Sequence, residues 1–419
     1  MAEAKAVGQG PAAPVEDEPR GFAGVARRVV DNVKSGNLGV LPIVIGLIFI
    51  VVFFGFKATN FFTPVNFVNI LIQMAGTAML AYGVVFVLLL GEIDLSISYV
   101  AGVGAVAVAE LQLPGSGHQI NGLLAMLAGI AICVVIGLGQ GSIVARVGVP
   151  SFVVTLAGFL IWQGVILQDL AKPGSIVIQD RWINYTATYG FSRTAGWLIA
   201  TGITALYAVV VFGGFIRKRR ARVLNERLWL AITKAIGVAI AAFGTVAICN
   251  HAFVVGTPLG LPLAGVLVVI FLVALTFLAK RTTFGRHVYA VGGNAEAARR
   301  AGINVPRIRT IVFMISSGMA AIGGIILAAN INSVSLSFGG GQLLLDSISA
   351  AVIGGVSLFG GRGEVRGAFL GALLLATVSN GLNTAGYTSG IIYIVTGIIL
   401  LMAVTLDTIA RRLQVRSGR

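Results

Sequence analysis

The sequence carries very little charge for its length. Of its 419 residues only 11% are charged, whereas 57% are hydrophobic, and the mean hydropathy is +0.95. This balance argues against one or two soluble domains, whose surfaces need more charged side chains. Apolar stretches of about 20 residues, enough to cross a hydrocarbon core of about 30 Å, recur from Leu38 nearly to the end of the chain. The composition therefore predicts a protein that crosses a membrane many times.

Several kinds of chemistry lack the residues that they need. Cys133 and Cys249 are the only cysteines and lie in apolar runs, which excludes a disulfide framework and a cysteine-based metal spacing. The three histidines, His118, His251 and His287, lie in or beside expected loops without a paired carboxylate. No Gly-x-x-x-x-Gly-Lys-Ser/Thr segment is present, so the chain has no standard phosphate-binding loop. We therefore expect no metal, cofactor or enzyme activity, and any ATP that drives the protein must bind to another subunit.

Acidic residues are half as numerous as basic ones, 15 against 30, and the net charge is +15. This excess does not indicate nucleic-acid binding, because the basic residues cluster in short loops at alternate ends of the apolar segments. With the N-terminus in the cytosol, most of the lysines and arginines fall on the cytosolic side, including the run Arg217–Arg220. We predict a multi-pass membrane protein with both termini cytosolic and with lipid rather than nucleic acid around it.

Glycine is abundant, with 56 residues, and glycine lets helix backbones approach closely inside a membrane. Gly137 and Gly141, and likewise Gly367 and Gly371, have the four-residue spacing typical of such contacts. The pattern predicts an all-α class, a polytopic membrane helical bundle of about 12 spans. The expected spans are 38–56, 67–90, 95–113, 121–145, 151–169, 195–215, 229–249, 261–279, 308–330, 342–359, 366–383 and 389–406.

We expect a cytosolic tail over 1–37, a transmembrane domain over 38–407 and a C-terminal cytosolic tail over 408–419. In the first tail, apolar residues between Phe22 and Val33 follow helical spacing, which fits either a helix on an anionic membrane surface or a solvated helix. The largest outer loop, 170–194, is rich in aromatic residues. These form either an interfacial belt or a docking surface for an external protein.

The segment Gly91–Ser96 (GEIDLS) places two carboxylates against long apolar runs. Carboxylates there are costly unless they are hydrated, paired or capping a helix. Asp94 or Ser96 can accept hydrogen bonds from the amides that begin the next helix, whereas the functional alternative is a break that shapes a passage through the membrane. On that alternative, we assign Glu92, Asp94 and Ser96 to the translocation path or its gate, together with Asp346 and Asn380 in later spans.

The segment from Arg281 to Arg309 is a long polar stretch between spans. Within it, residues 294–302 have the signals of a short helix of about two turns: an N-cap, an acidic start, a basic end and a terminal glycine. A helix this short is marginal alone in water, so we expect it to pack on a partner. Its residues are Asn294, Glu296, Ala297, Arg299, Arg300, Ala301 and Gly302, with Ala297 and Ala301 on one face.

Both segments resemble signatures of the monosaccharide permeases of ABC transporters. The matching stretches are Gly91–Ser96 and Gly285–Ile303, with further likeness at Val149–Gly158 and Asp346–Gly355. The resemblance runs from about residue 60 to the end of the chain. An added span and basic loop at about 215–250 resemble the xylose-type branch more than ribose- or galactose-type relatives.

This resemblance implies a type II-like ABC importer permease that carries a pentose or hexose. It also implies a homodimer, two cytosolic ABC ATPase domains and an external sugar-binding protein, with residues 294–302 as the coupling helix that contacts the ATPase. The coupling loop would span about 280–307. From the residues alone, an ion-coupled secondary sugar transporter is the alternative, although its proton relay would need carboxylates or histidines deep in the bundle.

Overall fold

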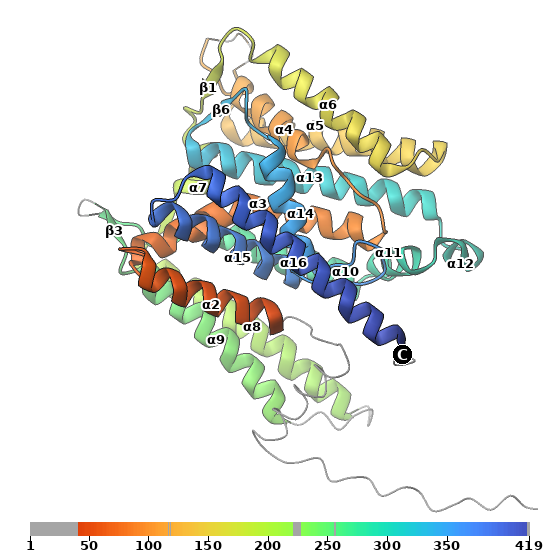
Figure 1. Ribbon diagram of the computed structural model, residues 1–419. Helices are drawn as coiled ribbons and strands as arrows, with labels where there is room; N and C mark the ends of the chain where they lie inside the picture. Colours follow the sequence, from red (N-terminus) through yellow and green to blue (C-terminus); the bar gives the residue numbers. More distant parts are fainter. Residues whose placement is uncertain (1–40, 116, 118, 221–227, 255–256, 417–419) are drawn as a thin grey trace, which may run out of the picture. The chain divides into compact units, whose positions relative to one another are not determined.

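The computed structural model describes residues 41–115, 117, 119–220, 228–254 and 257–416 (Figure 1). The predicted tail 1–37, with its amphipathic segment, lies outside this part of the chain. Val40–Val404 form one compact unit, whereas the end of α16 from Thr405 onward belongs to a second unit. The first unit contains every residue that the sequence assigns to a site.

Helices make up almost all of the regular structure, which confirms the predicted all-α class. They are α2 (Leu41–Lys57), α3 (Pro64–Leu89), α4 (Ile97–Leu111), α5 (Gly122–Ser142), the π-helical turn η1 (Ile143–Val147), α6 (Ser151–Asp169), α7 (Arg181–Thr188), α8 (Arg193–Arg220), α9 (Leu228–Cys249), α10 (Leu263–Arg281), α11 (Thr283–Gly293), α12 (Ala295–Arg300), α13 (Val305–Ile331), α14 (Gly341–Ile353), α15 (Val365–Thr384) and α16 (Ser389–Arg416). The strands are β1 (Ser175–Val177), β2 (Gly190–Phe191), β3 (Phe253–Val254), β4 (Thr257–Pro258), β5 (Leu261–Pro262) and β6 (Ser333–Ser335).

Each predicted span contains one of these helices. Eight helices of the described ranges have the length and apolar composition to cross a membrane: α3, α5 with η1, α6, α8, α9, α10, α13 and α15. Four shorter apolar helices, α2, α4, α14 and the first part of α16, occupy the remaining predicted spans. The predicted span 342–359 is too long, because α14 ends at Ile353. Gly355 then takes φ +81°, a left-handed conformation that stops a helix.

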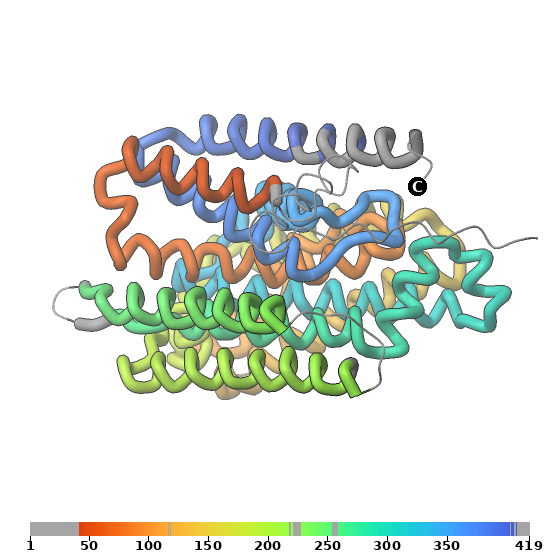
Figure 2. The backbone as a smooth tube through the Cα atoms, turned by 90° about the horizontal axis from the view of Figure 1, so that it is seen from below, coloured from red at the N-terminus to blue at the C-terminus, as the bar shows by residue number. Residues whose placement is uncertain are grey.

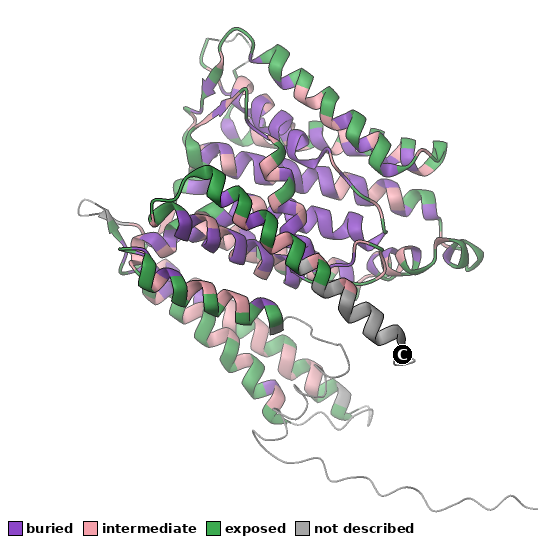
Figure 3. Ribbon diagram, viewed as in Figure 1, coloured by how far each residue is buried: buried purple, intermediate pink, exposed green. Residues whose placement is uncertain are grey.

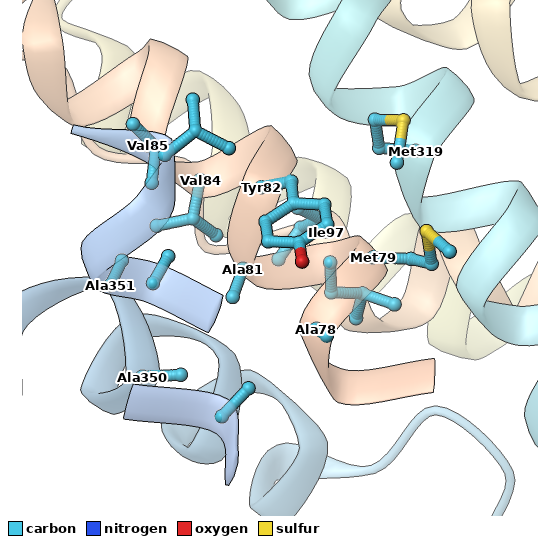
Figure 4. Close-up of a cluster of buried hydrophobic side chains, with 14 of the residues drawn as sticks. Ala78, Met79, Ala81, Tyr82, Val84, Val85, Ile97, Met319, Ala350 and Ala351 are labelled. Atoms are coloured by element: carbon cyan, nitrogen blue, oxygen red, sulfur yellow. The ribbon is translucent and has the colours of Figure 1, made fainter. Parts of the chain in front are cut away.

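The bundle is organised around α3 and α13. In the apolar stretch of each helix, 78% of the residues of α3 and 72% of those of α13 are buried, whereas 6% are buried in α8 and 11% in α9 (Figure 3). Tyr82 of α3 lies among Met79, Met319, Ala350 and Ala351 (Figure 4), and its hydroxyl donates to a main-chain carbonyl of α10 over 3.4 Å. Figure 2 shows α8 and α9 side by side at one edge of this unit, where both helices stay largely exposed.

Three connections meet at one end of the bundle, called here the α12 end: 90–96, 281–304 and 354–364. The Gly361 amide donates to the Leu89 carbonyl at the end of α3 over 2.9 Å, and the Tyr289 hydroxyl of α11 donates to the Gly363 carbonyl over 2.7 Å. Figure 1 shows α12 at this end.

The opposite end, called here the α7 end, contains the connections 170–192, 250–262 and 332–340. Strand β1 pairs with β6 and strand β2 pairs with β5, both antiparallel. The Gln112 side chain supports this region, because its Oε1 accepts from the amides of Gln179 and Asp180, each over 2.9 Å. These bonds fix α7 across the ends of the spans.

The aromatic residues of the loop 170–194 form a continuous row on and after α7. Neighbouring rings in the order Trp182, Tyr185, Tyr189 and Phe191 are 5.9, 5.4 and 5.2 Å apart between centroids. The first three stay partly exposed, at 37–40% of their surface. The row therefore presents a rigid aromatic face, which suits both a membrane-interface belt and a docking surface.

The glycine pairs predicted to bring helices together do so. A Cβ added at Gly137 would lie 2.5 Å from the Phe313 carbonyl oxygen and 2.9 Å from the Cα of Met314. A Cβ at Gly141 would lie 2.9 Å from the Cα of Thr310. Helices α5 and α13 thus meet backbone to backbone, and Gly367 and Gly371 bring α15 equally close to α14.

We expect Gly137→Ala to destabilise the protein by about 1–3 kcal/mol, the usual cost of overpacking, because the facing atoms of α13 are backbone and cannot turn away. Gly139→Ala is the matched control on the same helix, since a Cβ there meets nothing within 4 Å. Thermal unfolding of the detergent-solubilised proteins measures the difference. Equal midpoints for the two variants would contradict the backbone contact.

Candidate functional site

The connection from α3 to α4 is a tight turn that begins at Gly91, with φ +76°. Ser96 is the N-cap of α4, yet its side chain makes no capping hydrogen bond. Asp94 Oδ1 instead accepts from the Ser96 amide over 3.0 Å. A side chain that accepts from an amide at the helix start was predicted for Asp94 or Ser96, and it is confirmed for Asp94 alone.

Asp94 is the centre of a buried polar network that joins three spans. The residue is 4% exposed, and its Oδ1 also accepts from Ser96 Oγ over 2.7 Å. Its Oδ2 accepts from Ser316 Oγ of α13 over 3.0 Å. Both oxygens of the Asp94 side chain therefore accept hydrogen bonds. A buried carboxylate held this way is costly to leave unpaired, so its partners hold α4 and α13 in register.

Gln140 of α5 completes the network, and the structure places its side-chain Oε1, an acceptor, 3.0 Å from Ser96 Oγ. The Ser96 hydroxyl has one proton, and it donates this proton in a hydrogen bond to the Asp94 carboxylate, the stronger acceptor. The Gln140 amide therefore fits best with its NH₂ group turned to donate to Ser96 Oγ, which also gives that buried NH₂ a partner. The chain of donors runs from Gln140 through Ser96 to Asp94.

Neighbouring residues of the same turn are bound to further helices. Glu92 forms an ion pair with Arg309 of α13, with 3.1 Å between Oε1 and Nη2 and with both side chains mostly shielded from solvent. The Ile93 amide donates to Ser151 Oγ, and its carbonyl accepts from Thr155 Oγ1, both over 3.2 Å. Glu92–Ser96 is thus clamped by α5, α6 and α13, and it cannot move unless these helices move.

The polar segment 281–304 folds into two helices instead of one. Helix α11 begins at Thr283, where Thr282 Oγ1 accepts from the Gly285 amide over 3.1 Å. Helix α12 follows at once, capped by Asn294, whose Oδ1 accepts from the Ala297 amide over 2.9 Å. The predicted N-cap is confirmed, and so is the left-handed glycine after the helix, because Gly302 has φ +83°.

The exposed face of α12 carries its charge and its small residues. Glu296 pairs with Arg299 and with Arg300, the latter over 3.2 Å. These pairs are exposed, so each stabilises the helix by only about 0.2–0.5 kcal/mol. Ala297 and Ala301 are also exposed, whereas Ala298 is buried against the bundle. The helix therefore packs on the bundle through Ala298. Its exposed side presents the small side chains of Ala297 and Ala301 among charged ones.

Asp346 and Asn380 do not belong to the Asp94 network. Asp346 of α14 accepts from Gln342 Nε2 over 2.9 Å on its own helix. Asn380 of α15 donates to Gln73 Oε1 of α3 over 3.5 Å. Its Oδ1 is buried without a hydrogen-bond partner among the described residues. The structure therefore groups Glu92, Asp94 and Ser96 and leaves these two residues apart.

Sequence reasoning missed the partners that make the site. Arg309, Ser316 and Gln140 all hold Glu92–Ser96 in place, yet none of them belongs to a motif. Arg309 is one of many basic residues beside a span, and Ser316 and Gln140 are single polar residues in apolar runs. A polar residue inside a predicted span is the one signal that could have found them, since such residues need a partner.

Comparisons with known proteins agree with this architecture. Residues 66–404 match the family described as the permease component of branched-chain amino acid transport systems. The xylose transport system permease protein of Haemophilus influenzae is 34% identical over 90% of this chain and 98% of its own length. Its counterpart in Escherichia coli K12 is 35% identical over 91% and 94%, and the ribose import permease protein of the same organism is 32% identical over 87% and 92%. No solved structure shows significant similarity to the chain.

The expected likeness to sugar permeases is thereby confirmed. The family match covers most of the chain, and the identities extend over almost the whole length of each relative. The chain therefore belongs to this family of membrane-spanning transport permeases, and it is a transport subunit without an enzyme activity of its own.

Proposed function

We propose that this protein forms the membrane passage of an ATP-driven monosaccharide importer of the xylose type. The names of its relatives, xylose and ribose permeases, support the substrate class. The observation that carries the proposal is the anchored and exposed helix α12, which lies at the same end of the bundle as the buried Asp94 network. A permease without a phosphate-binding loop can use ATP only through such a contact with a separate ATPase.

The α12 end faces the cytosol in this proposal, and both termini of the chain are proposed to be cytosolic. Positive residues favour the cytosolic side of short membrane loops. At the α12 end the described residues include Arg146, Lys280, Arg281, Arg286, Arg299, Arg300, Arg307, Arg309, Arg362 and Arg366, whereas the α7 end has Lys57, Lys172, Arg181 and Arg193. The transmembrane domain 38–407 then lies in a prokaryotic inner membrane, with tails 1–37 and 408–419 inside.

Three partners follow from this role. A cytosolic ABC ATPase binds α12 through Ala297, Ala301 and the charged residues around them. An external sugar-binding protein delivers the sugar at the α7 end, where the aromatic row of α7 is exposed. A second copy of the chain completes a homodimeric passage.

The translocation path in this proposal is controlled by the Asp94 network. Glu92, Asp94 and Ser96 close the α12 end while α5, α6 and α13 hold them. Asp346 and Asn380 contribute polar groups within the bundle. The Oδ1 of Asn380, which has no hydrogen-bond partner within the described ranges, offers an acceptor for a sugar hydroxyl. An ion-coupled secondary transporter is not favoured, because the chain belongs to a family of transport-system permease components.

Uptake of radiolabelled D-xylose into membrane vesicles tests the proposed function. With the co-purifying ATPase and binding protein present, we expect uptake only when ATP is supplied on the cytosolic side, since the energy enters through a partner. A proton or sodium gradient without ATP should give no uptake. Uptake driven by the gradient alone would replace the proposal with secondary transport, and D-ribose in parallel tests the sugar class.

We expect Ala297→Trp to abolish ATP-driven uptake and to release the ATPase during purification. Ala297 is exposed between Glu296 and Arg299, so an indole there blocks a close approach without entering the bundle. Ala290→Trp, at an exposed position of α11, is the matched control and should retain the ATPase. Co-purification and uptake are the two measurements. Retention and normal uptake by Ala297→Trp would refute the assignment of α12.

We expect Asp94→Asn to lower uptake about tenfold or more, because the variant loses a charged acceptor that joins α4 and α13. Its amide can still accept from Ser96, and Ser316 Oγ can turn to accept from its NH₂ group, so folding should survive. Ser316→Ala removes only the bond to α13 and should give a smaller loss of uptake. Wild-type transport by Asp94→Asn, with normal expression, would reduce Asp94 to a helix cap.

A further inference from the structure

The last residues of α11 touch two other connections without any side chain between them. A Cβ added at Gly292 would overlap the Leu89 carbonyl oxygen and would lie 2.9 Å from the Gly361 nitrogen. Gly361 itself donates to the Leu89 carbonyl over 2.9 Å. Three backbone segments, from α11, from the end of α3 and from the α14–α15 connection, therefore meet at one point.

Glycine is required at this point for a second reason. Gly91, Gly360 and Gly361 have φ values of +76°, +86° and +71°, which L side chains rarely adopt. A Cβ on Gly360 would lie 2.8 Å from the Gly292 carbonyl oxygen and 2.9 Å from the Gly91 nitrogen. The sequence GGRG at 360–363 forms a tight turn, in which all three glycines have positive φ angles. We call Gly91, Gly292, Gly360 and Gly361 the glycine junction.

Side chains tie the same elements together beside the junction. Tyr289 of α11 donates its hydroxyl to the Gly363 carbonyl over 2.7 Å, and Lys280 at the end of α10 pairs with Glu364. Burial, and next the nearby Glu364 charge, raise the pKa of Tyr289 to about 12. The hydroxyl therefore keeps its proton and remains a donor at physiological pH.

The junction lies where a displacement of α11 would reach two parts of the bundle at once. Gly91 precedes Glu92–Ser96, and Gly360 and Gly361 link α14 to α15. Where two backbones touch without a side chain between them, a displacement of one cannot be absorbed by a change of rotamer. Movement of α11 must therefore either displace both connections or break the packing.

We propose that the glycine junction transmits the movement of α12 from the ATPase into the Glu92–Ser96 turn and into the α14–α15 connection. This inference rests on the proposed function. It assigns the binding of the ATPase and the onward transmission of its movement to different residues. The face of α12 that receives the ATPase is exposed, whereas Gly292 faces the bundle. A variant at the junction can therefore bind the ATPase and still fail to transport.

The test compares Gly292→Ala with Gly293→Ala, neighbours on α11. A Cβ at Gly292 meets the Leu89 carbonyl, whereas one at Gly293 meets nothing within 4 Å. We expect Gly292→Ala to retain the ATPase on purification and to lose ATP-driven D-xylose uptake by about tenfold or more, in the range of coupling effects between sites. Gly293→Ala should behave as wild type in both measurements.

A second pair decides the matter if Gly292→Ala does not insert. Gly361→Ala and Gly355→Ala both place alanine at a positive φ. A Cβ added at Gly361 would lie within 3.4 Å of the backbone of α11, whereas one at Gly355 meets nothing within 4 Å. Both variants introduce the same kind of backbone strain. A lower uptake in Gly361→Ala than in Gly355→Ala therefore supports transmission through the junction. Wild-type uptake in Gly292→Ala, or equal uptake in the second pair, overturns it. Absence of ATP-driven uptake in the wild type would overturn the proposed function itself, whatever the variants do.

Discussion

Close contact between helix backbones is the constraint on which this structure depends. Lipid is as apolar as the side chains of the spans, so burial of apolar surface gives helices little reason to associate. Glycines supply the alternative, because they let α5 meet α13 and α14 meet α15 at the distance of main-chain atoms. Glycines also allow close backbone contacts at the α12 end, where they lie between the segments that connect the spans. The glycine-rich composition is thus the source of the packing, and of the coupling in the proposed function.

Within this packing, polar groups determine which helices stay together. A buried carboxylate such as Asp94 needs several donors, and here they come from its own turn and from α13, while Gln140 of α5 supports one of them. Removing one partner leaves the group that it binds short of a hydrogen bond in a medium of low dielectric. The network therefore favours one arrangement of these helices over near alternatives. A passage gated at this point would open only when several helices move together.

The sequence predicted the spans, the Asp94 cap and the caps of α12, because each depends on local signals. Apolar length, Asn294 at a helix start and Gly302 after its end have the same meaning in any fold. It did not predict α11 as a separate helix or the ends of α14. It also did not predict that Arg309 meets Glu92 or that Gly292 meets Leu89. These are contacts between residues far apart in the chain, and no local pattern records them.

The two ends of the bundle are built by different means, which bears on how each can move. At the α7 end, short strands and the Gln112 side chain join the connections through main-chain hydrogen bonds, so this end holds a fixed shape. At the α12 end, glycine contacts bring α11 against the end of α3 and the α14–α15 connection. Tyr289 bonds α11 to Gly363, and Glu92 of the turn pairs with Arg309 of α13. In the proposed function, a push on α12 would reach Gly292 at the end of α11 and, through it, the backbone at Leu89 and Gly361. Among the described residues the paired strands lie at the α7 end, so the α12 end is the one suited to receive mechanical work.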